Sequence, residues 1–207
     1  MKRIRILIAD DHAVVRIGLS ALFGTEKDLE VVGVAANGDE AVAKALALKP
    51  DVVVMDLMMP GKSGVEATSE IVRADPSIRI LLLTTYATSD GIMRTLDAGA
   101  SGAILKTAPD DELVSSIRKV CQGERRYLSA EVRQLLADDP PIRELTDRQL
   151  GILGSITRGL TNSDIARQFG IREVSVKEHL ARIFNKIGAA NRAEAVAIVL
   201  RKHLLKI

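Results

Sequence analysis

Residues 52–61 place a single carboxylate at the end of an apolar run. Four apolar residues, 52–55, lead into Asp56, and the stretch is bounded by Pro50 and by Pro60-Gly61. An apolar run rich in β-branched residues and closed by turn formers favours a strand covered on both faces, which is typical of a parallel sheet flanked by helices. By itself, Asp56 fits a strand-end turn former or a helix N-cap equally well. Its role therefore depends on the rest of the chain.

The first 120 residues alternate between strand and helix patterns. We expect strands over residues 4–9, 31–36, 52–55, 78–84 and 102–105, and helices over residues 13–23, 39–48, 63–74, 90–98 and 109–120. Ser63 and Glu66 have the spacing of a capping box at the start of the third helix. Five strands and five helices with short connections predict an α/β fold with a doubly wound, five-stranded parallel sheet.

Polar side chains stand at the ends of four of these strands. Asp10 and Asp11 follow the first strand, Asp56 follows the third, Thr84 closes the fourth, and Lys106 follows the fifth. The carboxyl ends of parallel strands meet at one edge of the sheet, where doubly wound proteins bind ligands. Three carboxylates at this edge repel one another and favour a bound cation, and an all-oxygen ligand set favours Mg²⁺. Lys106 and the Thr84 hydroxyl add the cation and the donor that a phosphoryl group requires.

Other functions fit these polar residues less well. Each one alone fits a solvated loop residue equally well, but five at the strand ends make that interpretation unlikely for the set. The sequence after the first strand, Asp10-Asp11-His12, lacks the glycines of a dinucleotide site, and no P-loop motif occurs in the chain. His12 opens a helix, where a histidine is more often solvated than a ligand.

These residues resemble the receiver domains of two-component response regulators. The resemblance rests on Asp10-Asp11, Met55-Asp56-Leu57-Met58-Met59-Pro60-Gly61, Leu83-Thr84-Thr85 and Ile104-Leu105-Lys106. It implies that a sensor histidine kinase phosphorylates Asp56. It also implies that Asp11, Asp56 and the backbone carbonyl of Met58 hold Mg²⁺, with Asp10 acting through water.

One position departs from the receiver pattern. Ala103 stands three residues before Lys106, where receivers usually carry Tyr or Phe. Because that aromatic ring is thought to move inward with the threonine, its loss predicts weaker coupling between phosphorylation and dimerisation. Tyr86, two residues after Thr84, is a candidate substitute.

The second part of the chain has a different charge and a helical pattern. Residues 1–123 carry 14 Lys and Arg against 17 Asp and Glu, whereas residues 124–207 carry 15 against 10, which points to a polyanion as the partner of the second part. We expect a domain over residues 1–121, a partly ordered linker over 122–143 with a short helical patch at residues 130–137, and a DNA-binding domain over 144–207. Its helices are predicted over residues 146–157, 163–169 (capped by Asn162), 173–187 and 192–204, the second and third forming a helix-turn-helix.

This second part resembles the LuxR-type DNA-binding domain. The motifs are Leu145-Thr146, Arg148-Gln149, residues 159–166, residues 174–180, Lys186-Ile187-Gly188, Asn191-Arg192 and Ala195. With the receiver, they make the chain similar to the NarL/FixJ family of response regulators. The resemblance implies that the third helix enters the major groove of double-stranded DNA. The candidate DNA-binding residues are Ser175, Val176, Lys177, Glu178, His179, Arg182 and Lys186.

The sequence thus predicts a transcription factor controlled by phosphorylation and not an enzyme, dimeric when active, with RNA polymerase as a further partner. The alternative is a phosphorylation-independent regulator whose receiver is a constitutive dimerisation module. A phosphatase of the aspartyl-phosphate class would require a second Asp at position 58, which is Met58. The first apolar run is too short for a signal peptide or membrane span, and the single Cys121 excludes an internal disulfide, so we expect a cytoplasmic protein.

Overall fold

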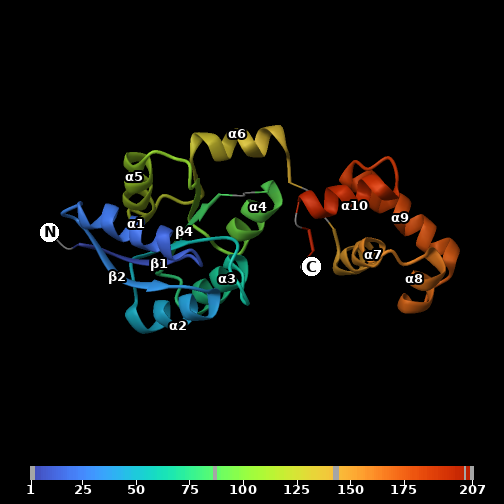
Figure 1. The fold of residues 1–207 in the computed structure, drawn as a ribbon, viewed down its shortest axis with the longest axis horizontal. Helices are drawn as coiled ribbons and strands as arrows, with labels where there is room; N and C mark the ends of the chain where they lie inside the picture. Colours follow the sequence, from blue (N-terminus) through green and yellow to red (C-terminus); the bar gives the residue numbers. More distant parts are fainter. Residues whose placement is uncertain (1–2, 86–87, 142–144, 203, 206–207) are drawn as a thin grey trace. The chain divides into compact units, whose positions relative to one another are not determined.

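The computed structural model describes residues 3–85, 88–141, 145–202 and 204–205. The chain divides into two compact units between Asp139 and Pro140 (Figure 1). Within the described ranges, no helix combines the length and the apolar character needed to cross a membrane.

The first unit is a doubly wound parallel sheet, as predicted. Its strands lie in the order β2-β1-β3-β4-β5-β6, and every neighbouring pair is parallel. The first five strands are β1 (Ile4–Ala9), β2 (Leu29–Ala35), β3 (Val52–Met55), β4 (Arg79–Thr84) and β5 (Gly102–Leu105). The helices between and after them are α1 (Ala13–Gly24), α2 (Gly38–Leu48), α3 (Gly64–Ala74), α4 (Ser89–Asp97) and α5 (Asp110–Cys121). The capping box of Ser63 and Glu66 at the start of α3 is confirmed.

Side chains that alternate along the strands build two cores, one on each face of the sheet. In β3, for example, Val53 and Met55 pack with α2, α3 and α4, whereas Val52 and Val54 pack with α1 and α5. Figure 1 shows α1 and α5 on the opposite side of the sheet from α2 and α3. The central strands are therefore buried on both faces, which explains their nearly continuous apolar sequence.

The helical patch expected at residues 130–137 is confirmed, but most of the predicted linker over residues 122–143 belongs to the first unit, which extends to Asp139. Tyr127–Leu128 forms β6, a sixth strand paired with β5, and Ala130–Asp138 forms α6. Val132 of α6 is fully buried in the same core as α2, α3 and α4, and Leu135 and Leu136 pack against that core. The prediction of five strands is thus one strand short. The sequence did not reveal β6, because two residues are too few to show a periodic pattern.

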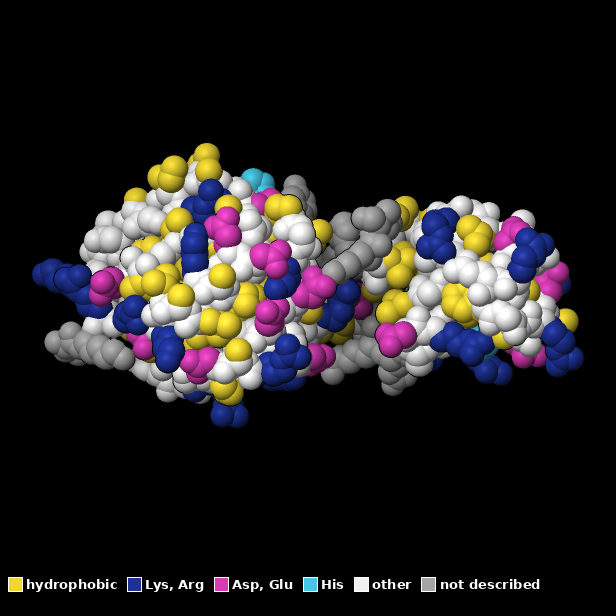
Figure 2. Space-filling model, turned by 90° about the horizontal axis from the view of Figure 1, so that it is seen from below, with side chains coloured by type: hydrophobic (Ala, Val, Ile, Leu, Met, Phe, Trp, Pro, Cys, Tyr) yellow, Lys and Arg dark blue, Asp and Glu magenta, His cyan; other side chains and the backbone are white. Residues whose placement is uncertain are grey.

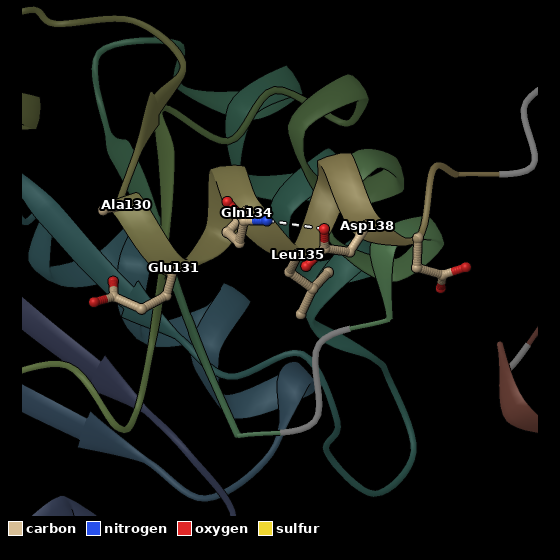
Figure 3. Close-up of a pocket in the computed structure, with 6 residues that line it drawn as sticks. Ala130, Glu131, Gln134, Leu135 and Asp138 are labelled. Atoms are coloured by element: carbon tan, nitrogen blue, oxygen red, sulfur yellow. Dashed lines mark hydrogen bonds between the residues drawn. The ribbon is translucent and has the colours of Figure 1, made fainter.

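A surface depression lies along α6. Its lining residues are Ala130, Glu131, Gln134, Leu135, Asp138 and Asp139. Figure 3 shows Gln134 donating a hydrogen bond of 2.8 Å to Asp138 across this surface. None of the predicted site residues lines the depression, so we do not treat it as the functional site.

The second unit is a bundle of four helices around one core. The helices are α7 (Asp147–Thr157), α8 (Asn162–Phe169), α9 (Glu173–Ile187) and α10 (Arg192–Arg201). Gly170 and Gly188 end α8 and α9 in the left-handed region, with φ of 62° and 72°, which glycine adopts without steric cost. The predicted cap of α8 is wrong by one residue: Thr161, not Asn162, accepts from the backbone N–H of Asp164 in a capping box. The last helix ends at Arg201, three residues earlier than predicted.

Candidate functional site

Backbone hydrogen bonds continue past the strand ends and fix the site residues at one edge of the sheet. The N–H of Asp56 donates to the carbonyl of Ala9, and the N–H of Lys106 donates to the carbonyl of Thr84, at 2.8 and 2.9 Å. Asp10 is likewise tied to β2 through the carbonyl of Ala35, at 3.1 Å. The predicted convergence of these residues is therefore built by the parallel register itself.

Lys106 joins two buried carboxylates. Its Nζ lies 2.5 Å from Asp10 Oδ2 and 3.3 Å from Asp56 Oδ2. The second oxygen of Asp56 accepts the backbone N–H of Leu57 at 2.9 Å. Thr84 is buried at the end of β4, and no hydrogen bond among the described residues ties its hydroxyl to these three groups.

Burial raises the pKa of Asp56 to about 6, and the neighbouring Asp10 charge acts in the same direction while Lys106 opposes both. Asp56 is only 5 % exposed, so water contributes little to its charged form. A carboxylate with weak solvation is a better nucleophile than a solvated one. Titratable groups shifted in this way are more common at functional sites than elsewhere.

This shift predicts a pH-dependent stability difference between the wild type and Asp56→Asn. Since the folded chain raises the pKa of Asp56 from 3.8 to about 6, the wild type loses stability as pH rises from about 4 to about 6. In metal-free buffer at pH 8, Asp56→Asn should therefore be more stable by about 1–3 kcal/mol, and at pH 4 the two should be equal. Urea unfolding at both pH values measures this. The exposed Asp97→Asn serves as the control, and a difference that does not grow between pH 4 and pH 8 would contradict the prediction.

Asp11 supplies a carboxylate oxygen suited to a metal ion. Its Oδ1 is shielded from solvent and accepts no hydrogen bond of acceptable geometry, although His12 Nδ1 lies 2.7 Å away. Ligand atoms of Asp10, Asp11, His12 and Asp56 all lie within 4.8 Å of one another. A buried, unsatisfied oxygen beside two further carboxylates fits a hard divalent cation such as Mg²⁺. His12 is mostly exposed, which agrees with the expectation of a solvated histidine.

Gly64 was missed by the sequence analysis and holds the loop after β3 against Asp56. A Cβ on Gly64 would lie 2.1 Å from the carbonyl oxygen of Asp56, and the Gly64 N–H donates to Leu57 at 3.0 Å. Any larger residue would push this loop, which carries Met58, away from the site. The glycine directly after the Ser63 cap was the available signal. The Met58 side chain is exposed and leaves only its backbone for a role at the site.

Ala103 is fully buried in β5, on the face that α6 covers. It pairs with Leu82 and Leu128, and its carbonyl accepts the N–H of Ser129 at 3.2 Å. The small side chain thus leaves room for the core that includes Val132. The suggested substitute, Tyr86, lies outside the described residues.

Filling this space with a ring should destabilise the first unit. We expect Ala103→Tyr to lower the free energy of unfolding by about 1–3 kcal/mol, because the added ring overpacks the core beneath α6. Urea denaturation measures the change, with Ala43→Tyr on the exposed surface of α2 as the control. A stability equal to that of the wild type would show that α6 yields easily and that the space above Ala103 is available to an aromatic residue.

The burial pattern divides α9 into two faces. The inner face carries Val176, Leu180, Ile183 and Ile187. These four residues are spaced by four, three and four positions. A second set with the same spacing starts two residues earlier, about 200° around the helix, and we call it the outer stripe of α9: Val174, Glu178, Ala181 and Asn185. All four residues of the outer stripe are exposed. An amphipathic helix with this pattern has one face free for a partner.

The predicted DNA-binding residues fall on different sides of α9. Lys177, Glu178, Arg182 and Lys186 are exposed, and Ser175 and His179 are half-buried. Val176 is fully buried in the helical core, so its predicted DNA contact is corrected: the side chain packs inside the unit. The outer stripe of α9 adds three exposed residues that the sequence analysis did not single out, Val174, Ala181 and Asn185. Figure 2 shows Lys and Arg side chains at several places on the surface of the second unit.

Family comparisons agree with this geometry in both units. The model of the response regulator receiver domain matches residues 6–118, and that of the bacterial regulatory proteins of the luxR family matches residues 143–199. The chain therefore belongs to the response regulators of the NarL/FixJ family. Members of this family are DNA-binding transcription regulators under phosphorylation control, not enzymes, and the phosphorylation-independent alternative is not favoured.

Individual relatives extend over nearly the whole chain. The response regulator protein VraR of Staphylococcus aureus is 37 % identical over 98 % of this chain and 99 % of its own length. The crystal structure of the response regulator ChrA of a heme-sensing two-component system is 34 % identical, covers 99 % of this chain and all of its own, and has a TM-score of 0.59. A LuxR-family response regulator from Aurantimonas sp. SI85-9A1 is 37 % identical over 66 % of this chain and 97 % of its own, with a TM-score of 0.62.

Proposed function

We propose that Asp56 accepts a phosphoryl group from the phosphohistidine of a sensor histidine kinase and that this modification controls DNA binding by α9. The observation that carries the proposal is the edge of the sheet where Asp10, Asp11 and Asp56 meet Lys106. The short distances from Lys106 Nζ to Asp10 and Asp56 support this role, because a cation lies beside the Asp56 carboxylate. This arrangement suits a transferring phosphoryl group, whose charge must be compensated.

In the transfer step, an oxygen of ionised Asp56 attacks phosphorus, and the bond between phosphorus and the imidazole nitrogen breaks with its electron pair left on nitrogen. Lys106 then pairs with a phosphoryl oxygen, and the Thr84 hydroxyl donates to another. Asp11, Asp56 and the carbonyl of Met58 would hold Mg²⁺ directly, with Asp10 acting through water. When bound, the ion neutralises charge on the phosphoryl oxygens.

For the second unit we propose that α9 enters the major groove of double-stranded DNA. Lys177 is placed to donate to a guanine edge or to a phosphate, and Glu178 to accept from the amino group of cytosine. Arg182 and Lys186 supply further cations along the same helix, and the half-buried Ser175 and His179 position the helix on phosphates.

The active form is proposed to be a homodimer in the cytoplasm, in contact with RNA polymerase at its target genes. Two of the described large apolar residues are unusually exposed, Val14 at 81 % and Ile17 at 70 %, and they lie one turn apart on α1. A second copy of the chain would cover this apolar face. Paired receivers would also present two copies of α9 to a symmetric DNA site.

Selection of bound fragments from random DNA tests the proposal as a whole. The full chain should enrich a two-part sequence, and enrichment should increase when acyl phosphate and Mg²⁺ are added. If acyl phosphate did not change enrichment by the wild type, and Asp56→Asn enriched the same sequence as strongly as the wild type, the receiver would be a constitutive dimerisation module and phosphorylation control would be rejected.

A further inference from the structure

An exposed apolar side chain stands on the first turn of α9, outside everything that holds the second unit together. Val174 is 64 % exposed, and it is not among the residues that form the core of this unit. Among the described residues of the second unit, Leu200 of α10 is the one other large apolar side chain with comparable exposure, at 47 %. A solvent-facing valine adds nothing to helix stability, because its β-branched side chain is a weaker helix former than alanine, lysine or glutamate.

The position of Val174 in α9 indicates a partner. It opens the outer stripe of α9, one turn before Glu178 and almost opposite the buried Val176. Exposed Arg172 and Lys177 lie on either side of it in sequence. Arg172 is the N-cap of α9 and makes no capping hydrogen bond with its side chain. The valine is thus an apolar point at the N-terminal end of a helix, the end that helix-turn-helix proteins place against base edges, and its neighbour Glu173 is paired with Lys177 at 3.8 Å.

In the major groove, an apolar side chain of this size has one specific target. The 5-methyl group of thymine is the apolar feature that distinguishes a base edge there, and the other edge groups are hydrogen-bond donors and acceptors. Ala181, two turns further along the outer stripe, is small and exposed and lets the helix backbone approach the groove closely. Glu178 lies between Val174 and Ala181, and its carboxylate is repelled by phosphates. This repulsion also favours an orientation in which the outer stripe faces base edges instead of the DNA backbone.

We propose that Val174 is a specificity-determining residue that contacts a thymine methyl group, so that each half-site carries a thymine opposite the first turn of α9. This inference rests on the proposed insertion of α9 into the major groove. Lys177 alone does not fix a base, because it can donate to a guanine or to a phosphate. A contact from Val174 would specify a thymine in the site.

The experiment removes single methyl groups from the DNA. Sites are first selected with the full chain, Mg²⁺ and beryllofluoride, and each thymine is then replaced in turn by uracil, which differs only in lacking the 5-methyl group. For the wild type, we expect one sensitive thymine position in each half-site. Replacing a single such thymine by uracil should weaken binding about fourfold, which corresponds to about 0.8 kcal/mol for one buried methyl. Val174→Ser should bind the thymine and uracil sites equally, whereas Val174→Thr, which keeps one methyl, should retain part of the preference.

Leu200→Ser is the matched control, since it also removes an exposed apolar side chain from this unit and should keep the fourfold effect. Insensitivity of the wild type to uracil at every position, or an unchanged fourfold effect in Val174→Ser, would overturn the inference. Its failure is distinguishable from failure of the proposed function. If Lys177→Ala weakens binding to the selected site while uracil has no effect, α9 is the DNA-binding helix and only the thymine contact is rejected. If no sequence is enriched, both are rejected.

Discussion

Replacing Asp56 by Asn is expected to abolish labelling of the chain by acyl phosphate in the presence of Mg²⁺. The reason is geometric: Asp56 is the carboxylate that lies at the end of the central strand β3 with Lys106 beside it, and Asp10 is already held by Lys106 at 2.5 Å. An amide cannot form the acyl phosphate. Incorporation of labelled phosphate, followed by treatment with hydroxylamine, measures the loss.

Three variants make this test specific. Asp97→Asn, which changes an exposed acid of α4, should be labelled like the wild type. Lys106→Ala and Asp11→Asn should be labelled more slowly, because they remove the compensating cation and an oxygen ligand while leaving the acceptor in place. Hydroxylamine-sensitive label that persists in Asp56→Asn would show that another carboxylate accepts the phosphoryl group.

Replacing Lys177 by Ala is expected to produce the second large effect, a loss of specific DNA affinity of about 1–3 kcal/mol if the lysine reads a base. If it binds a phosphate, affinity should fall for all sequences and the salt dependence should drop by about one unit. The Lys177 side chain is 65 % exposed and 3.8 Å from Glu173, so its loss should cost the fold little. Titrations of specific and non-specific DNA at several salt concentrations separate the two cases.

The control for this variant is Arg201→Ala, which removes an exposed cation from α10 and tests whether net charge alone explains a change. If Lys177→Ala bound the specific site as tightly as the wild type, a different surface would have to carry the DNA contact. In a symmetric dimer the two half-sites should lie about one helical turn apart.

The acid cluster could be predicted from sequence because a strand end is a local feature. Apolar runs at β1 and β3 stop at Asp10 and Asp56, and parallel topology then brings such ends together without further information. The two cores follow from the same patterns, since strands covered on both faces show long apolar runs.

Features that depend on packing between distant segments could not be predicted in the same way. The role of Gly64 depends on how closely α3 approaches the Asp56 carbonyl, and β6 exists only because Tyr127 and Leu128 pair with β5. Assignment of Val176 to DNA failed because a motif gives neighbours in sequence, whereas a helix places residues 174 and 176 on opposite faces.

The incorporation of α6 into the first unit leaves a short tether to the DNA-binding helices. Between the end of α6 at Asp138 and the start of α7 at Asp147 lie eight residues, which reach at most about 28 Å when fully extended, whereas the predicted 22-residue linker with its helical patch would reach about 60 Å. Accessible volume scales with the cube of this reach and is therefore smaller by a factor of roughly 10. Once two receivers pair, their DNA-binding units are confined to a small shared volume, so that binding of the first half-site presents the second at a high local concentration.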